Sequence, residues 1–209
     1  CGMRFTPMQV EALKELSNIG AAHAATSLSQ IIGTTVNMNV PEVNLLDISD
    51  LGAVLGDEVA TMIVFQLQGD LPHGGFLILH FSQDSARKLA GIMCGCEESG
   101  QSLGELGQSA LIEAGNIMIS SFLNATSEML SLVMLPSPPY LATDILHAMV
   151  QSLIVGMGVD YNDIILFRIQ LNSPEHRIEG NIVLLIEDGT LQKMAGILES
   201  LIGNPAGPA

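Results

Sequence analysis

The sequence predicts an α+β fold that is internally duplicated, with two pseudo-symmetric halves that share a largely antiparallel sheet and carry two long helices on one side. Two observations predict this fold. Short motifs recur in the same order in both halves of the chain. Each half also contains two apolar runs separated by turn-forming residues, the pattern of a β-hairpin, and hairpin strands pair antiparallel. We expect a single domain over residues 1–209, with repeat halves at about 6–100 and 101–203.

The repeat has an offset of 98 residues at its start and of 105 residues towards its end, because seven residues are inserted in the second half. The matches are ELSNI at 15–19 with EAGNI at 113–117, Pro41 with Pro139, and KLAGIM at 88–93 with KMAGIL at 193–198. Matches that keep their order at nearly constant spacing indicate a duplicated structural unit.

Helices are expected to open and close each half. The opening helices are predicted near 7–32 and 104–130, and the closing helices near 82–94 and 188–202. Thr6, Pro7 and Gln9 give the first helix a strong start signal. Thr6 and Gln9 have the spacing of a capping box, and proline is favoured in the first turn, where its missing N–H is not needed.

Strands are expected to fill the middle of each half. A short strand follows each opening helix, near 35–40 and 131–135, and the proline that comes next is expected to end it. A further helix is predicted near 143–157 in the second half. The hairpin strands, joined by turns rich in Gly, Pro, Asn and Asp, are predicted at 60–68 with 74–81 and at 163–171 with 177–186.

The chain is acidic and unusually apolar. It has 22 Asp and Glu against seven Lys and Arg, a net charge of -15, and a mean hydropathy of +0.43. This charge argues against binding to nucleic acid. It favours a partner with a basic patch, or serves solubility alone. No apolar run reaches the ~18 residues of a membrane span and no signal peptide is evident, so we expect a cytoplasmic protein without a membrane span.

The first opening helix places a small set of polar groups on one face. At about 100° per residue, Glu11, Glu15 and Asn18 fall within about 60° of one another, opposite the apolar arc. The rest of this face consists of small side chains, namely Ala22, Ala25, Thr26 and Ser29. A stripe of small residues allows another protein to approach closely, so that Glu and Asn would be the groups that reach it.

The second opening helix repeats this arrangement. Ser109, Glu113 and Asn116 share its exposed face, which continues as Ser120, Leu123, Asn124 and Ser127. On a single helix, a Glu and an Asn at this spacing are commonly no more than solvated surface. Their recurrence at the matching place in a diverged copy favours a functional site.

These residues resemble the motif of the CheC/CheX/FliY phosphatase family, which is Asp or Ser, three residues, Glu, two residues, Asn, 22 residues and Pro. The second copy has all four motif positions, as Ser109, Glu113, Asn116 and Pro139. The first copy has Glu15, Asn18 and Pro41, but Glu11 stands where the family has Asp or Ser. Two motifs in one chain resemble the CheC type rather than the single-site CheX. The resemblance covers about 5–202.

The resemblance implies a phosphatase that hydrolyses the phospho-aspartate of a CheY-like response regulator, in chemotaxis signal termination or adaptation. It implies that Asn18 and Asn116 are catalytic amides and that Glu15 and Glu113 contact a lysine of the regulator. Positioning an in-line water is how catalysis of phosphoryl transfer commonly works. The protein would need no cofactor or metal of its own, since the magnesium ion belongs to the regulator. Because Glu11 departs from the motif, we expect the second site to be at least as active as the first.

Two other functions are compatible with parts of the sequence. One is a non-catalytic CheC-like adaptor that binds a CheD-type deamidase or a flagellar switch component, and the resemblance places the CheD contact near the helix at 143–157. The other is a carboxylate metalloenzyme that uses Glu15 and Glu113, although no His or Cys has useful ligand spacing. Cys94 and Cys96 lack the second pair that a zinc site needs, and are expected as reduced thiols.

Overall fold

The computed structural model describes residues 5–95, 103–157 and 161–203. In the first half, the chain forms α1 (Pro7–Ile32), β1 (Asn37–Asp47), η1 (Ile48–Asp50), α2 (Leu51–Leu55), β2 (Val59–Gly69), β3 (Gly75–Ser82) and α3 (Gln83–Cys94). In the second half, it forms α4 (Glu105–Leu130), β4 (Met134–Pro136), β5 (Tyr140–Ile145), α5 (Leu146–Val155), β6 (Asp163–Asn172), β7 (Arg177–Ile186) and α6 (Asp188–Gly203).

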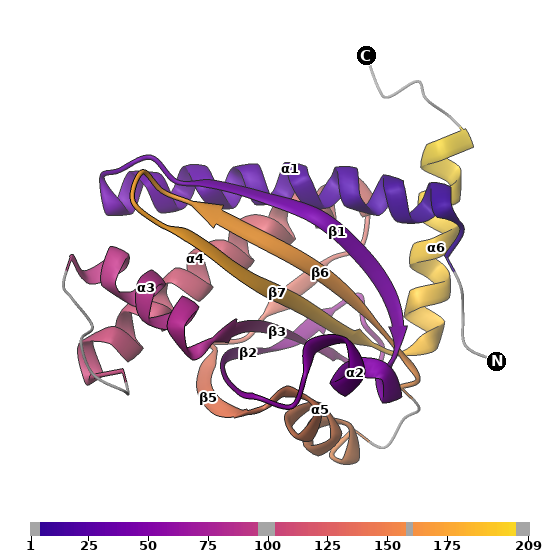
Figure 1. Ribbon diagram of the computed structural model, residues 1–209. Coiled ribbons are helices and arrows are strands. Elements are labelled where there is room, and N and C mark those ends of the chain that lie inside the picture. The colour runs from indigo at the N-terminus through magenta and orange to yellow at the C-terminus, as the bar shows by residue number, and fades with distance from the viewer. Residues whose placement is uncertain (1–4, 96–102, 158–160, 204–209) are drawn as a thin grey trace.

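A single seven-stranded sheet runs through the molecule, with the strand order β1-β6-β7-β3-β2-β4 and with β5 also paired to β2. All strand pairs within the described residues are antiparallel. The long helices α1 and α4 lie on one face of the sheet, and α2 and α5 lie on the other (Figure 1). The predicted α+β fold, with two long helices on one side of a largely antiparallel sheet, is confirmed.

The two halves exchange strands across the sheet. The edge strand β1 of the first half pairs with β6 of the second, while β4 and β5 of the second half pair with β2 of the first. At the centre, β3 pairs with β7, so that Gly75 lies opposite Ile186 and Gly180 opposite Phe81. Because Gly75 and Gly180 are equivalent in the repeat, as are Phe81 and Ile186, exchanging the halves leaves this register unchanged. The duplication in the sequence therefore corresponds to a pseudo-two-fold symmetry axis in the structure, which relates the two halves.

The capping box predicted at the start of the first helix is present. Thr6 Oγ1 accepts a hydrogen bond from the Gln9 backbone N–H at 3.2 Å, and Gln9 Oε1 accepts one from the Thr6 N–H at 2.8 Å. The Gln9 amide also donates to the carbonyl oxygen of Ala195 in α6, at 3.1 Å. The capping box therefore fixes the start of α1 and also joins it to the last helix of the chain.

Two local predictions are wrong. Pro41 does not end a strand: β1 continues to Asp47, and the register shifts between Asn39 and Glu42 as in a β-bulge. The strand accepts a proline because β1 lies at the edge of the sheet, where not every N–H is needed for pairing. The prediction of a reduced thiol is wrong for Cys94, which is disulfide-bonded.

The central strands require a glycine at position 180. A β-carbon added there would lie 2.4 Å from the Phe81 ring and 3.0 Å from the His80 carbonyl oxygen. We expect Gly180→Ala to reduce the free energy of unfolding by roughly 1–3 kcal/mol, because the buried ring or the strand must move. Urea unfolding of the purified variant measures this loss.

Gly196→Ala in α6 is the matched control for that experiment. No atom lies within 4 Å of a β-carbon added at Gly196, so alanine should be tolerated and should stabilise the helix by up to about 1 kcal/mol. Equal stabilities of the two variants would contradict the close approach of β3 and β7.

Candidate functional site

The motif residues lie on the outer surfaces of the two long helices. On α1, Glu11 and Glu15 are exposed and Asn18 is half-buried. On α4, Ser109, Glu113 and Asn116 repeat this, with the first two exposed and the asparagine half-buried. The structure thus brings together the Glu and the Asn of each copy. The catalytic roles predicted for them remain predictions.

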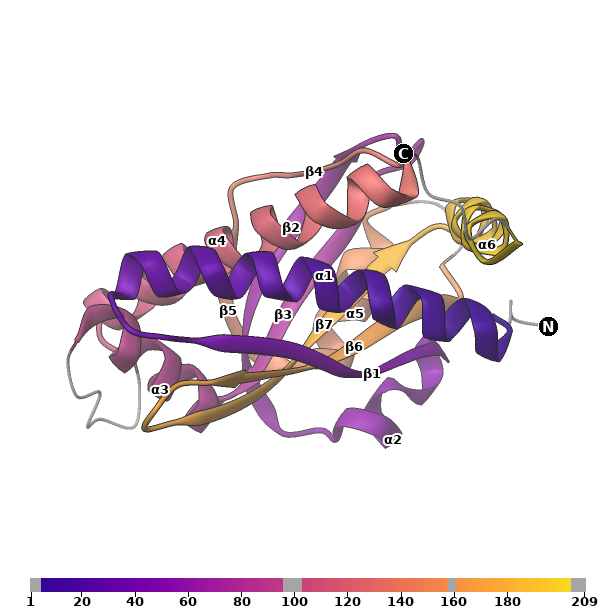
Figure 2. The ribbon, with the colours of Figure 1, turned by 90° about the horizontal axis from the view of Figure 1, so that it is seen from above.

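The two copies form separate sites. Figure 2 shows α1 and α4 side by side, and they run in opposite directions. They touch where Ser27 Oγ lies 3.1 Å from Ser121 Oγ. Ser27 lies nine residues after Asn18, and Ser121 lies five residues after Asn116. The two amides are therefore separated by about two helical turns or more, and each has its own approach from solvent.

The Asn116 side chain makes no hydrogen bond to any residue that the structure describes, although its helix is firmly placed. Its neighbours Ala114, Gly115 and Met118 are buried. A β-carbon added at Gly115 would lie 2.9 Å from Ile63 of the sheet, so the helix lies very close to the strands at this point. Asn116 is therefore an amide without a partner among the described residues, carried on a rigid support.

The Asn18 side chain, by contrast, is bonded to the chain itself. Its Oδ1 accepts a hydrogen bond from the Val40 N–H at 2.8 Å, and its Nδ2 donates to the carbonyl oxygens of Val40 and Lys14, each at 3.0 Å. We call the pair of bonds between Asn18 and the Val40 backbone the Asn18 clasp. The sequence did not reveal it, because a helical wheel shows only which face a residue lies on.

The clasp assigns a structural meaning to the motif spacing in the first copy. Val40 is the residue before the motif proline, Pro41, and β1 packs against α1. A separation of 22 residues between Asn18 and Val40 returns the chain from the helix to the same point on its surface. The spacing is therefore compatible with a structural role as well as a catalytic one.

The predicted stripe of small residues is only partly exposed. Ala22 and Thr26 are exposed and Ser29 is half-buried, but Ala25 is 6% exposed and Leu123 on α4 is 1% exposed. The wheel assumed one buried arc for each helix. Because β1 packs along this side of α1, where Asn18 and Ser29 bond to Val40 and Val36, and β4 lies in the same way beside α4, each helix buries a further side.

No group of three or more His, Cys, Asp or Glu within the described residues could hold a metal ion. Glu15 and Glu113 belong to different helices and do not meet. No helix in the described part of the chain is both long and apolar enough to span a membrane.

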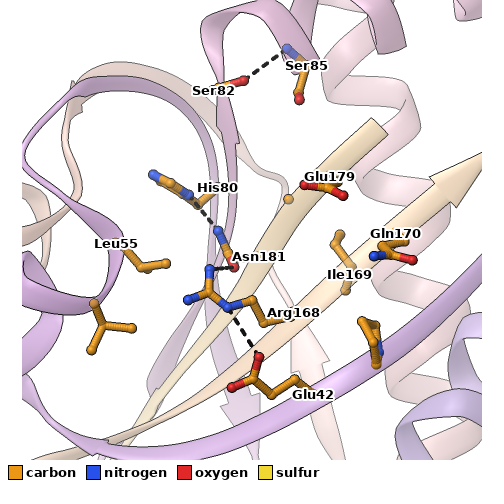
Figure 3. A pocket seen from close by; sticks show the side chains of 13 residues that line it. Glu42, Leu55, His80, Ser82, Ser85, Arg168, Ile169, Gln170, Glu179 and Asn181 are labelled. Atoms are coloured by element: carbon orange, nitrogen blue, oxygen red, sulfur yellow. Dashed lines mark hydrogen bonds and ion pairs between the residues drawn. The ribbon is translucent and has the colours of Figure 1, made fainter. Parts of the chain in front are cut away.

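A polar cavity of about 540 Å³ opens on the opposite face of the sheet, beside α2 (Figure 3). A chain of four side chains runs along it. Glu42 Oε2 lies 3.7 Å from Arg168 Nε, Arg168 donates to Asn181 Oδ1 at 3.4 Å, and Asn181 Nδ2 lies 3.1 Å from His80 Nδ1. The sequence pattern contained one sign of this cluster, since His80 and Asn181 each interrupt an apolar strand.

His80 is uncharged at neutral pH. Burial, with a smaller contribution from the positive charge of Arg168, lowers its pKa to about 4. Because the Arg168 guanidinium donates to Asn181 Oδ1, the Asn181 amide nitrogen faces the ring and donates to His80 Nδ1. The proton of the neutral ring is then on Nε2. The cavity lies on the face of the sheet opposite α1 and α4 and takes no part in the motif sites.

Together, the fold and its sites define a class of duplicated α+β proteins in which two long helices, related by pseudo-two-fold symmetry, each present a Glu and an Asn. The family model described as "CheC-like family" matches residues 8–45 and 106–141, once in each half. The chain is 32% identical to the CheY-P phosphatase CheC of Bacillus subtilis over 148 residues, 68% of this chain and 69% of that protein. It is 34% identical to CheC1 of Halobacterium salinarum over 134 residues, 64% and 68% of the two chains. This chain belongs to the CheC-like family.

The fold agrees with a solved structure of the flagellar protein FliY. The FliY structure of Thermotoga maritima matches with a TM-score of 0.73 and 21% sequence identity, over 95% of this chain and 99% of that chain. Both matched segments of the family model contain a Glu–Asn pair, and the Asn18 clasp lies within the first of them.

The buried His80 should make the stability depend on pH. Its pKa in the folded protein lies below the value of the unfolded chain, so as pH falls from about 6.5 to about 4 the unfolded state gains a proton that the folded state does not. We expect this group to cost about 2 kcal/mol of stability at pH 5 relative to pH 7.5. In His80→Gln, urea unfolding should show a loss between these two pH values that is smaller by that amount. Parallel losses in the two proteins would contradict this.

Proposed function

We propose that this protein hydrolyses the phospho-aspartate of a CheY-like response regulator and so ends or adapts a chemotaxis signal. The proposal is supported by membership of the CheC-like family, in which the Bacillus subtilis relative is a CheY-P phosphatase. It is supported also by the second copy of the motif, in which Ser109, Glu113 and Asn116 lie on one accessible surface of α4.

The Asn116 amide, which is left without a hydrogen-bond partner in the described ranges of the chain, is the observation that carries the proposal. An amide has a donor and an acceptor, so it can hold a water molecule in a fixed orientation without itself gaining or losing a proton. Asn116 is half-buried, is fixed by a packed helix, and makes no hydrogen bond within the described residues that would have to be broken. Such a group can enter the active site of a docked protein at little energetic cost.

The chemistry then divides between the two proteins. Glu113 is exposed three residues before Asn116 and would accept a hydrogen bond from a lysine of the regulator, which sets the docking position. The Asn116 amide would orient a water in line with the phosphorus. The water oxygen bonds to phosphorus as the bond to the aspartyl oxygen breaks, which releases inorganic phosphate and restores the carboxylate. The magnesium ion of the regulator would neutralise the charge on the phosphoryl oxygens.

The acidic surface supports this pairing. The net charge of -15 favours encounter with a basic patch, and a lysine beside a phosphorylated aspartate is a target of that kind. Opposite charges bring two proteins together faster without requiring a large buried interface. A short-lived complex suits an enzyme that must act on many regulator molecules.

We expect Asn116→Ala to lower the turnover of a phosphorylated CheY-like regulator roughly tenfold or more, because the water loses its orienting group. The residual rate comes from the first site, so Asn18→Ala combined with Asn116→Ala should leave only the spontaneous decay of the regulator. Release of inorganic phosphate at saturating magnesium measures both rates. Decay that is as fast with the double variant as with the unaltered protein would remove the proposal.

Stability controls accompany that experiment. Asn116→Ala should change the free energy of unfolding by less than about 0.5 kcal/mol, since the side chain makes no hydrogen bond to the part of the chain that the structure describes. Asn18→Ala should cost about 2 kcal/mol, because the Asn18 clasp is lost. Gln192→Ala, which removes an exposed amide from α6, is the matched control and should leave turnover unchanged.

We also propose that α5 contacts a CheD-type deamidase. Four apolar residues at helical spacing, Ile145, Met149, Leu153 and Met157, form a row along this segment that is only half-buried. The helix is instead anchored by Leu146 and Val150. An apolar row that its own chain covers incompletely is suited to a partner surface.

Val155, which is 84% exposed at the end of α5, allows a test of that contact. Val155→Asp should weaken binding of a CheD-type deamidase at least about tenfold by calorimetry, because a charge would have to be desolvated in the interface. Leu201→Asp on α6 is the control and should bind normally. Equal affinities of all three proteins would refute the contact, while strong binding without any regulator turnover would favour the adaptor function.

A further inference from the structure

We infer that the backbone N–H of Val40 restrains the first site by holding the Asn18 amide against the chain, and that proline at the equivalent position, Pro138, leaves Asn116 free. This inference rests on the proposed function. It makes Val40 a positioning residue, which acts on the reaction only through Asn18.

The Asn18 clasp uses most of the bonding capacity of the amide. Both N–H groups of Nδ2 are engaged, one with the Val40 carbonyl and one with the Lys14 carbonyl, and Oδ1 accepts from Val40 N–H at 2.8 Å. To orient a water in another protein, the side chain must first leave these partners. Asn18 can therefore act only in the fraction of molecules in which the clasp is open.

A second bond between helix and strand shows that the two copies share the same local geometry. Ser29 Oγ accepts from the Val36 N–H at 2.9 Å in the first copy. At the repeat offset of 98, Ser127 Oγ accepts from the Met134 N–H at 3.4 Å. The chain leaves the long helix and starts the next strand in the same way in both halves.

The two copies of the motif differ four residues after Val36. The equivalent of Val40 is Pro138, and proline has no backbone N–H. The donor that holds Asn18 Oδ1 in the first copy therefore does not exist in the second. The strand is also interrupted here, since β4 ends at Pro136 and β5 begins at Tyr140. This difference explains why Asn18 is bonded to the chain while Asn116 has no hydrogen-bond partner among the described residues.

The Val40 N–H is available for the clasp because of the bulge around Pro41. In β1, Asn39 lies opposite Gln170 and Glu42 lies opposite Arg168, so the two residues between them fall outside the regular register. The N–H of Val40 bonds to Asn18 instead of to β6. Removing this N–H consequently opens the clasp without taking a hydrogen bond from the sheet.

The experiment uses chains in which only the first site can act, with Asn116→Ala as background. Val40→Pro recreates the Pro-Pro pair of the second copy and should raise turnover of a phosphorylated CheY-like regulator roughly fivefold, the factor expected for one lost hydrogen bond. Since Val40 is fully buried and this variant could fold poorly, a second variant replaces only the Val40 amide by an ester. The ester keeps the side chain and should give the same increase.

The matched control is the same ester at Val36, in the same background. It removes a bond of similar length between α1 and the residue just before β1, from Val36 N–H to Ser29 Oγ, without touching Asn18. Turnover should then stay at the background value. An increase specific to position 40 supports the inference, because loss of a merely structural bond would not accelerate the reaction.

Two results would overturn the inference. If the Val40 ester folds and its turnover is unchanged or lower than the background, the clasp does not restrain Asn18. If the Val36 ester accelerates turnover as much as the Val40 ester, general loosening of β1 is the cause. The unaltered protein, whose second site is intact, tests the proposed function in the same assay. If the unaltered protein does not turn over the regulator, both the proposed function and this inference are wrong. If it does, a negative result with the Val40 ester contradicts only this inference.

Discussion

The pairing of β3 with β7 is the contact on which the rest of the molecule depends, because there the two halves of the chain become one fold. Gly75 and Gly180 occupy equivalent positions in it, and each is packed so closely that a β-carbon would collide with the opposite strand. A register that is unchanged when the halves are exchanged places α1 and α4 as a pseudo-symmetric pair on one face. The positions of Glu15 and Asn18, and of Glu113 and Asn116, follow from that pairing rather than from any contact between the sites.

The two halves share a pseudo-symmetric backbone but differ in their side chains at equivalent positions. At the repeat offset of 105, the equivalents of His80 and Asn181 are Leu185 and Phe76, which pack in the apolar cluster beneath α5. At the other end, α2 has five residues where α5 has ten, and the polar cavity lies beside it. One end of this face is thus closed by an apolar helix, while the other keeps a buried chain of polar groups.

The sequence predicts the features that depend on local chemistry or on the repeat. Thr6 and Gln9 mark the start of α1, and the apolar runs around turn residues predict the hairpins. The recurrence of Glu and Asn identifies the motif surfaces of both long helices. It fails where an outcome depends on which element lies next to another. Pro41 is accommodated within β1 only because β1 is an edge strand, and Ala25 is buried because β1 packs along the side of α1 that carries Asn18 and Ser29. The Asn18 clasp joins residues 22 positions apart, and only the packing of β1 on α1 makes it possible.

The clasp also shows how one motif can carry two uses that exclude each other. An asparagine bonded to Val40 stabilises the junction of α1 and β1, and an asparagine that enters a partner must give up those bonds. A single-copy protein would have to compromise between them. With two copies, the first can strengthen the fold with Asn18 while the second, relieved of a donor by Pro138, keeps Asn116 available. The residue before the motif proline is therefore as informative about a site of this kind as the Glu and the Asn themselves.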